Sequence, residues 1–299
     1  MFVDYRGNVF GLLAWQWRNV VLFIGAACTA LAAHAIAGDL FPKISPIPVA
    51  TLGGAVGIFV SFRTNSAYQR WWEGRQLWGR LINVSRHFAT QALVYLRDRP
   101  EEARALVRRH IAYTHVLRCR LRDQDALADA DVLAFLSPEE VAALKGQSSP
   151  GHVLVHAQLE ALFRLAREGA IDPMVLSDFD ESLRVVLDVQ GGCERIKKTP
   201  FPRGYTFISD RLVTAFGLLL PWTLVQDMGL WGVPLSILVC FAFALISEAG
   251  RVLEDPFTMF WPALPLSALA KTIEINLRQI QGEKEVPPMP VQDARGILM

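Results

Sequence analysis

The chain has 299 residues, and its 30 Lys and Arg against 29 Asp and Glu leave a formal net charge of +1. This balance argues against a nucleic-acid partner, and four scattered cysteines without a CxxC pair argue against a disulfide framework or a zinc site. Because 52% of the residues are hydrophobic and 20% are charged, apolar and polar segments must be segregated along the chain.

Four apolar stretches approach the length that a membrane helix needs, which is about 20 residues. The first and fourth satisfy this length outright, whereas the second and third need their flanking residues. The third extends backwards from Leu212 only if Asp210 and Arg211 sit at the membrane interface. We predict membrane spans at about residues 19–37, 47–62, 208–225 and 228–247. The first residues lack a basic start and a small-residue cleavage site, so we expect no cleaved signal peptide.

The four spans form two hairpins whose links, residues 38–46 and 226–229, contain one basic residue, Lys43. The opposite flanks are rich in Lys and Arg, which predicts that both termini and the long middle segment are cytoplasmic. The alternative is a soluble helical protein whose core helices are apolar all round.

The middle segment, residues 63–206, is predicted to be helical and cytoplasmic. Apolar residues at helical spacing predict helices over Leu77–Asp98 and Glu101–Asp123. Ser137 and Asp172 each precede a proline, which is typical of helix N-caps, and the second helix should reach about Lys198. After the fourth span we expect a break at Pro256 and an amphipathic helix, so that residues 251–280 are also cytoplasmic. Residues 281–299 have the composition of a loose tail, unless a partner surface holds them. We treat residues 1–299 as a single domain.

No phosphate-binding glycine loop, metal-ligand spacing or nucleophile elbow occurs in the sequence, so neither a cofactor nor a metal is predicted. A membrane enzyme would also need grouped polar residues within the spans, and those present, such as His34 and Thr51, are isolated. The chain is therefore predicted not to be an enzyme.

The second span has two adjoining stripes that repeat every four residues. Gly53, Gly57 and Ser61 form a small-xxx-small pattern, which lets helix backbones approach closely. Gly54, Ile58 and Phe62 form the neighbouring stripe. One face can therefore pack tightly while the other presents apolar side chains to a lumen, where a ring of several copies would form a narrow constriction. The alternative is plain helix–helix packing.

Four sequence motifs are shared with a known family. They are "FRTNSAYQRWWEGRQLWG" after the second span, "CERIKKTPFPRGY" before the third, and "LEDPF" followed by "LPLSALAKTIEINL" after the fourth. Together they resemble bestrophins, especially the bacterial branch, and the likeness covers about residues 15–280.

The resemblance implies an all-α membrane protein with four transmembrane helices and a cytoplasmic helical bundle. It would form a homopentamer around one axial pore, surrounded by lipids of a bacterial inner membrane. The neck of the pore would be lined by Gly54, Ile58 and Phe62; bestrophins have a bulky aliphatic residue in place of Gly54, so this neck is expected to be wider at that level. A cytoplasmic aperture would fall at Met174, after the pair Asp172-Pro173.

The resemblance also implies an ion channel for monovalent ions. Eukaryotic bestrophins pass chloride and other anions, whereas some bacterial relatives pass cations such as sodium, and the near-neutral charge does not decide between them. The family's calcium clasp needs several carboxylates, but here only Glu254 and Asp255 precede the acid-free stretch FTMFWPALP. We therefore predict a channel that calcium does not gate. The alternative function is a membrane-anchored scaffold whose cytoplasmic helices bind a partner.

A cluster of charged and aromatic residues follows the second span: Arg63, Arg70, Trp71, Trp72 and Glu73. The tryptophans suit a membrane interface. Arg70 and Glu73 are spaced to pair along one helix, leaving Arg63 for another helix. We expect this cluster to anchor the pore helix, so that replacing Trp72 or Glu73 impairs assembly and leaves ion selectivity little changed.

Overall fold

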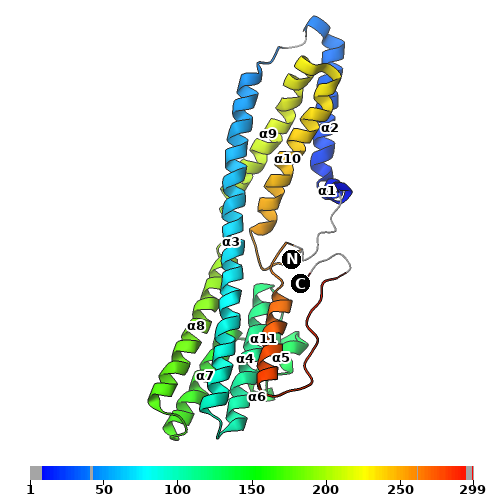
Figure 1. The fold of residues 1–299 in the computed structure, drawn as a ribbon. Coiled ribbons are helices and arrows are strands. Elements are labelled where there is room, and N and C mark those ends of the chain that lie inside the picture. Colours follow the sequence, from blue (N-terminus) through cyan, green and yellow to red (C-terminus); the bar gives the residue numbers. More distant parts are fainter. Residues whose placement is uncertain (1–8, 41–42, 261, 294–297, 299) are drawn as a thin grey trace. The chain divides into compact units, whose positions relative to one another are not determined.

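The computed structural model describes residues 9–40, 43–260, 262–293 and 298, and this part of the chain is helical without strands (Figure 1). Three helical stretches in it are long and apolar enough to cross a membrane: Trp17–Ala37, Pro46–Tyr95 and Gly204–Leu253. The helices, with 3₁₀ turns written η, are α1 (Val9–Trp15), α2 (Trp17–Ala37), η1 (Gly38–Leu40), α3 (Pro46–Tyr95), α4 (Pro100–Leu121), η2 (Ala126–Ala128), α5 (Ala130–Leu133), α6 (Pro138–Leu144), α7 (Pro150–Arg167), α8 (Pro173–Lys198), α9 (Arg203–Met228), η3 (Gly229–Trp231), α10 (Gly232–Leu253) and α11 (Leu266–Ile280).

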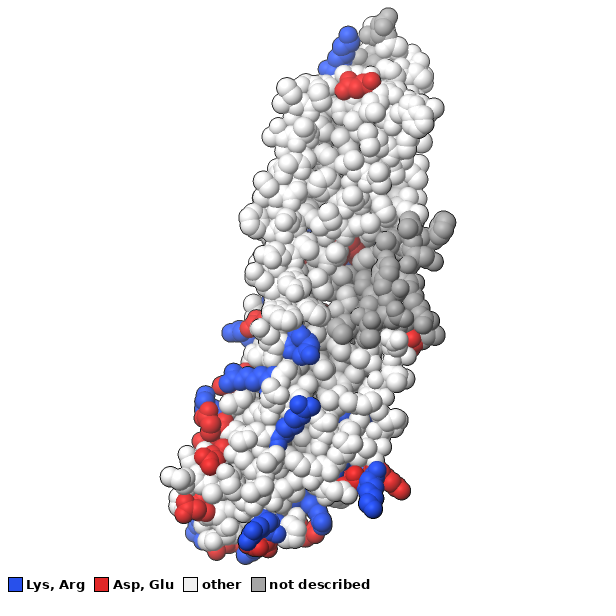
Figure 2. Space-filling view, viewed as in Figure 1, with Lys and Arg blue, Asp and Glu red and all other residues white. Residues whose placement is uncertain are grey.

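The chain divides into two compact units, and α3 contributes to both. Of the described residues, the apolar unit contains those within 9–71 and 200–255, and the polar unit contains those within 72–199 and from 256 onwards. In the face shown in Figure 2, charged side chains crowd the surface of the polar unit and are nearly absent from the apolar helices.

The apolar unit is a bundle of α2, α9, α10 and the first part of α3, in which α2, α9 and α10 all contact one another (Figure 1). The candidate span Gly204–Leu253 contains both α9 and α10, which η3 joins into a hairpin. Gly229 stands at this turn with φ of +56°, a left-handed conformation that favours glycine. The core combines two aromatic rings with valines and two smaller side chains: Phe23, Val49, Val56, Val60, Val213, Phe216, Cys240 and Ala244.

The polar unit packs α4 between α7 and α11, and α8 against α7. Two predicted caps are confirmed. Ser137 forms a reciprocal capping box with Glu140 at the start of α6, and the Asp172 side chain accepts a hydrogen bond from the Met174 backbone N–H at the start of α8. Of the predicted tail, the first residues are held against α11, because Arg278 donates to the Glu283 carboxylate and to the carbonyl oxygen of Glu285. Residues 294–297 and 299 lie outside the described part.

The helix predicted at Leu77–Asp98 is not a separate element. α3 is a single helix from Pro46 to Tyr95, which continues from the apolar stretch through the arginine-rich motif without a break. Arg, Gln and Glu are good helix formers, so a change from apolar to charged residues does not end a helix.

Candidate pore-lining helix

One face of α3 packs tightly inside the apolar unit. A Cβ atom added to Gly53 would lie 2.8 Å from Cε2 of Phe216 on α9. Val56 and Val60 on the same side of the helix are fully buried. The small residue at 53 therefore leaves room for the Phe216 ring of α9. The other two residues of the predicted small-xxx-small stripe are less closely packed, because a Cβ atom at Gly57 would meet Phe243 only at 3.7 Å and Ser61 is exposed.

The adjoining stripe of α3 is open. A Cβ atom added to Gly54 would meet no atom within 4 Å. The residues one and two turns later are exposed, Ile58 by 59% and Phe62 by 60%. Together with Gly57 and Ser61 they line a shallow hollow of about 440 Å³. The two sides of α3 therefore differ in packing. Gly53 lies against α9, whereas Gly54, Ile58 and Phe62 lie against no other helix of the described chain.

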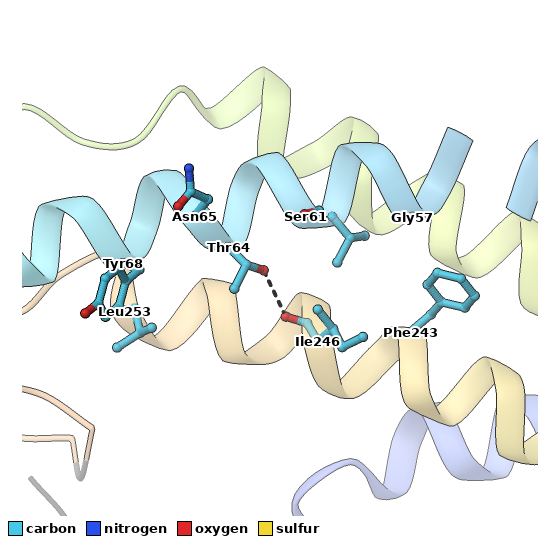
Figure 3. A pocket seen from close by; sticks show the side chains of 9 residues that line it. Gly57, Ser61, Thr64, Asn65, Tyr68, Phe243, Ile246 and Leu253 are labelled. Atoms are coloured by element: carbon cyan, nitrogen blue, oxygen red, sulfur yellow. Dashed lines mark hydrogen bonds between the residues drawn. The ribbon is translucent and has the colours of Figure 1, made fainter. Parts of the chain in front are cut away.

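A groove runs between α3 and α10 beside the open stripe (Figure 3). It has a volume of about 490 Å³. The two helices are joined along it by a hydrogen bond of 3.2 Å from the Thr64 hydroxyl to the carbonyl oxygen of Ile246. Its walls mix polar and apolar side chains, with Ser61, Asn65 and Tyr68 from α3 and Phe243 and Leu253 from α10.

Arg63 is the most buried member of the cluster after the second span. Its Nη1 donates to Asp210 on α9 at 2.7 Å and to the Ser247 hydroxyl on α10 at 3.2 Å. Its Nε and Nη2 both lie 3.0 Å from Glu254 Oε1, just after α10. A guanidinium group has the donors to bridge two carboxylates in this way. Arg63 therefore ties α3 to α9 and to the end of α10.

The other members of the cluster have different partners. Arg70 donates from Nε to the carbonyl oxygen of Glu254 at 3.0 Å. The rings of Trp71 and Tyr68 stack with centroids 6.1 Å apart, and Trp72 is 47% exposed.

The predicted pairing of Arg70 with Glu73 is wrong. Glu73 instead forms its ion pair with Arg195 of α8, within the polar unit. The pair is not deeply buried, since 43% of the Glu73 side chain and 67% of the Arg195 side chain are exposed. Spacing along one helix favoured Arg70, but a partner on an adjacent helix competes successfully for the carboxylate.

Sequence reasoning missed three partners of the cluster: Asp210, Glu254 and Arg195. Asp210 could have been found, because an ionisable residue within an apolar span is normally paired. Glu254 was considered only as part of a possible calcium clasp. Its carboxylate is occupied by Arg63, with the Thr206 hydroxyl 3.4 Å away. Among the described residues there is no group of three or more His, Cys, Asp or Glu side chains that could hold a metal ion.

Met174 lies in the first turn of α8, in the polar unit. Its side chain is 76% exposed, while its backbone N–H is fixed by the Asp172 cap at 2.8 Å. A large apolar side chain thus projects from a rigid helix start.

A family model described as the bacterial and fungal bestrophin protein matches residues 1–279. The chain belongs to this bestrophin family. This bestrophin is 34% identical over 252 residues to the voltage-dependent anion channel-forming protein YneE of Escherichia coli K12, covering 84% of this chain and 82% of that protein. It is 34% identical over 246 residues to the voltage-dependent anion channel-forming protein mll4386 of Mesorhizobium japonicum, covering 82% and 78%.

Solved structures show the same fold. A bacterial bestrophin homologue from Klebsiella pneumoniae superposes on this bestrophin with a TM-score of 0.85 at 29% sequence identity, covering 89% of this chain and 98% of that chain. The helices that carry the open stripe and the Arg63 cluster therefore belong to a fold shared across the family, although the sequences have diverged considerably.

Proposed function

We propose that this bestrophin is an ion channel and that the open stripe of α3 lines its pore. The observation that supports this is the composition of the exposed face of α3. Between residues 50 and 69 it consists mainly of small and polar residues, with Ile58, Phe62 and Tyr68 as the only large apolar ones: Ala50, Thr51, Gly54, Ile58, Ser61, Phe62, Asn65, Tyr68 and Gln69.

The other helices of the apolar unit have a different exposed surface. Large apolar side chains predominate there, among them Val21, Leu22 and Ile24 on α2, Leu218 and Leu219 on α9, and Leu235 and Leu238 on α10. Such faces suit lipid tails, whereas the exposed face of α3 suits contact with water. The side chains of Ile58 and Phe62 would narrow the lumen on this face. A single copy cannot enclose a lumen with one helix, so the proposal requires several copies around an axis. The homopentamer implied by the family resemblance would satisfy this requirement.

The membrane arrangement follows from the same helices. We propose four spans, formed by α2, the first part of α3, α9 and α10, in a bacterial inner membrane. The links between α2 and α3 and between α9 and α10 would lie outside, because basic residues concentrate on the opposite flanks. The termini and the polar unit would then be cytoplasmic.

For the permeant ion we propose monovalent anions such as chloride. Two relatives at 34% identity are named voltage-dependent anion channel-forming proteins. The edge of a phenyl ring carries partial positive charge, so Phe62 can face an anion that has lost part of its water shell. Calcium is not part of the proposed gating, because Arg63 already neutralises Glu254 and no acidic residue lies between Pro256 and Pro265.

The deciding experiment is a reversal-potential measurement on purified protein in planar bilayers under a potassium chloride gradient. We expect a reversal potential near the chloride equilibrium potential and a shift when gluconate replaces chloride on one side. A potential near that of potassium would identify a cation channel instead. Calcium chelation should leave the current unchanged. No ion flux from reconstituted liposomes would favour the scaffold function, in which the spans serve only as anchors.

Met174 is proposed as a second constriction on the cytoplasmic side, because it is exposed at a capped helix start. Met174→Cys can be treated with charged methanethiosulfonate reagents during recording. A negatively charged adduct should reduce anion current more than a positively charged one. Equal currents before and after complete modification would remove Met174 from the ion path.

A further inference from the structure

Arg122 lies directly after α4 in the polar unit and is only 8% exposed. Its Nη1 donates to the Ser267 hydroxyl in the first turn of α11 at 2.6 Å. Its Nε and Nη2 are buried and have no hydrogen-bond acceptor among the described residues. A buried cation normally has a carboxylate or another acceptor for these groups, because desolvated N–H donors without partners are costly.

The nearby carboxylates are engaged elsewhere. Asp123 pairs with Lys197 at 2.8 Å, and Asp129 with Arg118 at 2.6 Å. Asp131 lies 2.9 Å from Lys271. Burial and the charge of Arg118 lower the pKa of Arg122 to about 10, which still leaves it positively charged at neutral pH.

The second part of the site is the N-terminus of α11, a helix of 15 residues. Pro265 at its N-cap offers no side-chain hydrogen bond, and Pro265 and Leu266 are buried. Leu266 N–H donates to the carbonyl oxygen of Leu264, and the first helical hydrogen bond is that of Leu269 to Pro265. Within the described residues, the N–H groups of Ser267 and Ala268 have no backbone acceptor outside the helix. Such a helix start attracts negative charge.

We propose that a small inorganic anion of the size of chloride binds between the guanidinium group of Arg122 and the first turn of α11. Two independent features require the same kind of partner there: a buried cation whose donors lack acceptors, and an uncapped, buried helix N-terminus. The surrounding residues Ala263, Leu264 and Leu266 are all buried, which favours a monoatomic ion over a larger organic anion. The anion would join α4 to α11, and the site belongs to the polar unit, whereas the open stripe of α3 belongs to the apolar unit.

Bromide provides a direct test, because it replaces chloride and scatters anomalously. Crystals of the full-length protein grown in sodium bromide should show an anomalous peak within hydrogen-bond distance of Arg122 Nε or Nη2. A map with bromide peaks elsewhere and none beside Arg122 would overturn the proposal. So would a water or a side chain of another copy occupying that position.

Stability measurements give a second readout. In sodium gluconate at constant ionic strength, adding sodium chloride should raise the unfolding midpoint of the wild-type protein saturably, by a few degrees. Arg122→Met should lose this rise, while the control Arg104→Met, at an exposed position on α4, should keep it. An undiminished chloride effect in Arg122→Met would overturn the site.

If Arg122→Met does not fold, Arg122→Lys takes its place. It keeps the positive charge but lacks the planar donor group, so the chloride effect should need a higher concentration. If the unfolding midpoint of Arg122→Lys rose at the same chloride concentrations as that of the wild type, this result would also overturn the site. Neither readout involves ion flow, so both remain valid whether or not the protein conducts.

Discussion

Arg63 and Asp210 form an ion pair of 2.7 Å between α3 and α9, in a bundle whose core is a cluster of apolar side chains. The Arg63 side chain is fully buried, whereas half of the Asp210 side chain is exposed. Glu254, with 22% of its side chain exposed, is the more enclosed of the two carboxylates. The structural importance of the cluster therefore rests on Arg63, which holds two acids from different segments.

Replacing Arg63 should destabilise the protein strongly. Arg63→Met keeps the length of the side chain but leaves Glu254 in a partly desolvated site without its cation, a loss on the order of 3 kcal/mol. We expect a lower unfolding midpoint and less assembled protein in size-exclusion chromatography. Arg97→Met, at a position where 82% of the side chain is exposed, is the control. Equal midpoints for the two variants would show that the Arg63 cluster is not an anchor.

Replacing Glu73 should have a much smaller effect, which changes the expectation drawn from the sequence. Its pair with Arg195 is exposed on both sides, and such pairs contribute about 0–1 kcal/mol once solvent screening is included. We expect Glu73→Gln to assemble as the wild type does in size-exclusion chromatography. Loss of assembly in Glu73→Gln would instead assign Glu73 a contact with another copy.

Alanine substitutions at Gly53 and Gly54 compare a packed and an open position on one helix. Gly53→Ala brings a methyl group to 2.8 Å from the buried Phe216 ring, which must shift against Phe243, so we expect a loss of about 1–3 kcal/mol. Gly54→Ala enters open space and should be neutral or slightly stabilising, because alanine favours a helix over glycine. Thermal unfolding of both variants checks this, and a larger loss in Gly54→Ala would contradict the assignment of the two stripes.

The shared face of Gly54, Ile58 and Phe62 could be predicted from sequence because residues four apart on one helix share a face, whatever surrounds the helix. The packing stripe was predicted less well, since Gly53 lies against α9 but Ser61 is exposed. The caps at Ser137 and Asp172 were predictable for a similar reason, since their hydrogen bonds join residues only two or three positions apart. The spacing of residues along the chain is enough to predict both the shared face on α3 and the two caps.

The partners of Arg63 could not be predicted in this way. Asp210 and Glu254 are 147 and 191 positions away in the chain, and only the packing of α9 and α10 brings them to α3. The continuity of α3 was missed for another reason. Hydropathy locates the end of a membrane span, but it does not locate the end of the helix. The helical backbone of α3 continues to Tyr95, a few residues before Pro100, which cannot continue a helix.

His110 should make the protein less stable at mildly acidic pH. It is fully buried, with a ring nitrogen 2.9 Å from the Ser85 hydroxyl and its ring stacked on Phe88, and burial lowers its pKa from 6.5 to about 4. Above pH 6.5 the imidazole is neutral in both states. Between pH 6.5 and 4, His110 is protonated in the unfolded chain but stays neutral in the folded protein. The free energy of unfolding therefore falls by up to about 3 kcal/mol over this range.

Chemical unfolding of detergent-solubilised protein at pH 7 and pH 5 measures this effect. His110→Phe should be less stable than the wild type at pH 7, because Ser85 loses its partner, but it should lose less stability on going to pH 5. His156→Gln, at an exposed position, should show the wild-type dependence on pH. An unchanged pH dependence in His110→Phe would mean that other groups dominate in this range.

Shortening the side chains of the open stripe should increase ion flow. If Ile58 and Phe62 form the narrowest apolar part of the pore, each alanine substitution widens it and lowers the cost of dehydrating the ion, so Phe62→Ala and Ile58→Ala should each raise single-channel conductance. Leu238→Ala removes an equally exposed apolar side chain from α10 and should leave conductance unchanged. The reversal potential under a salt gradient should move little in either α3 variant, because no charge is altered. Wild-type conductance in both α3 variants, or an increase in Leu238→Ala as large as theirs, would place the barrier to ion flow elsewhere in the channel.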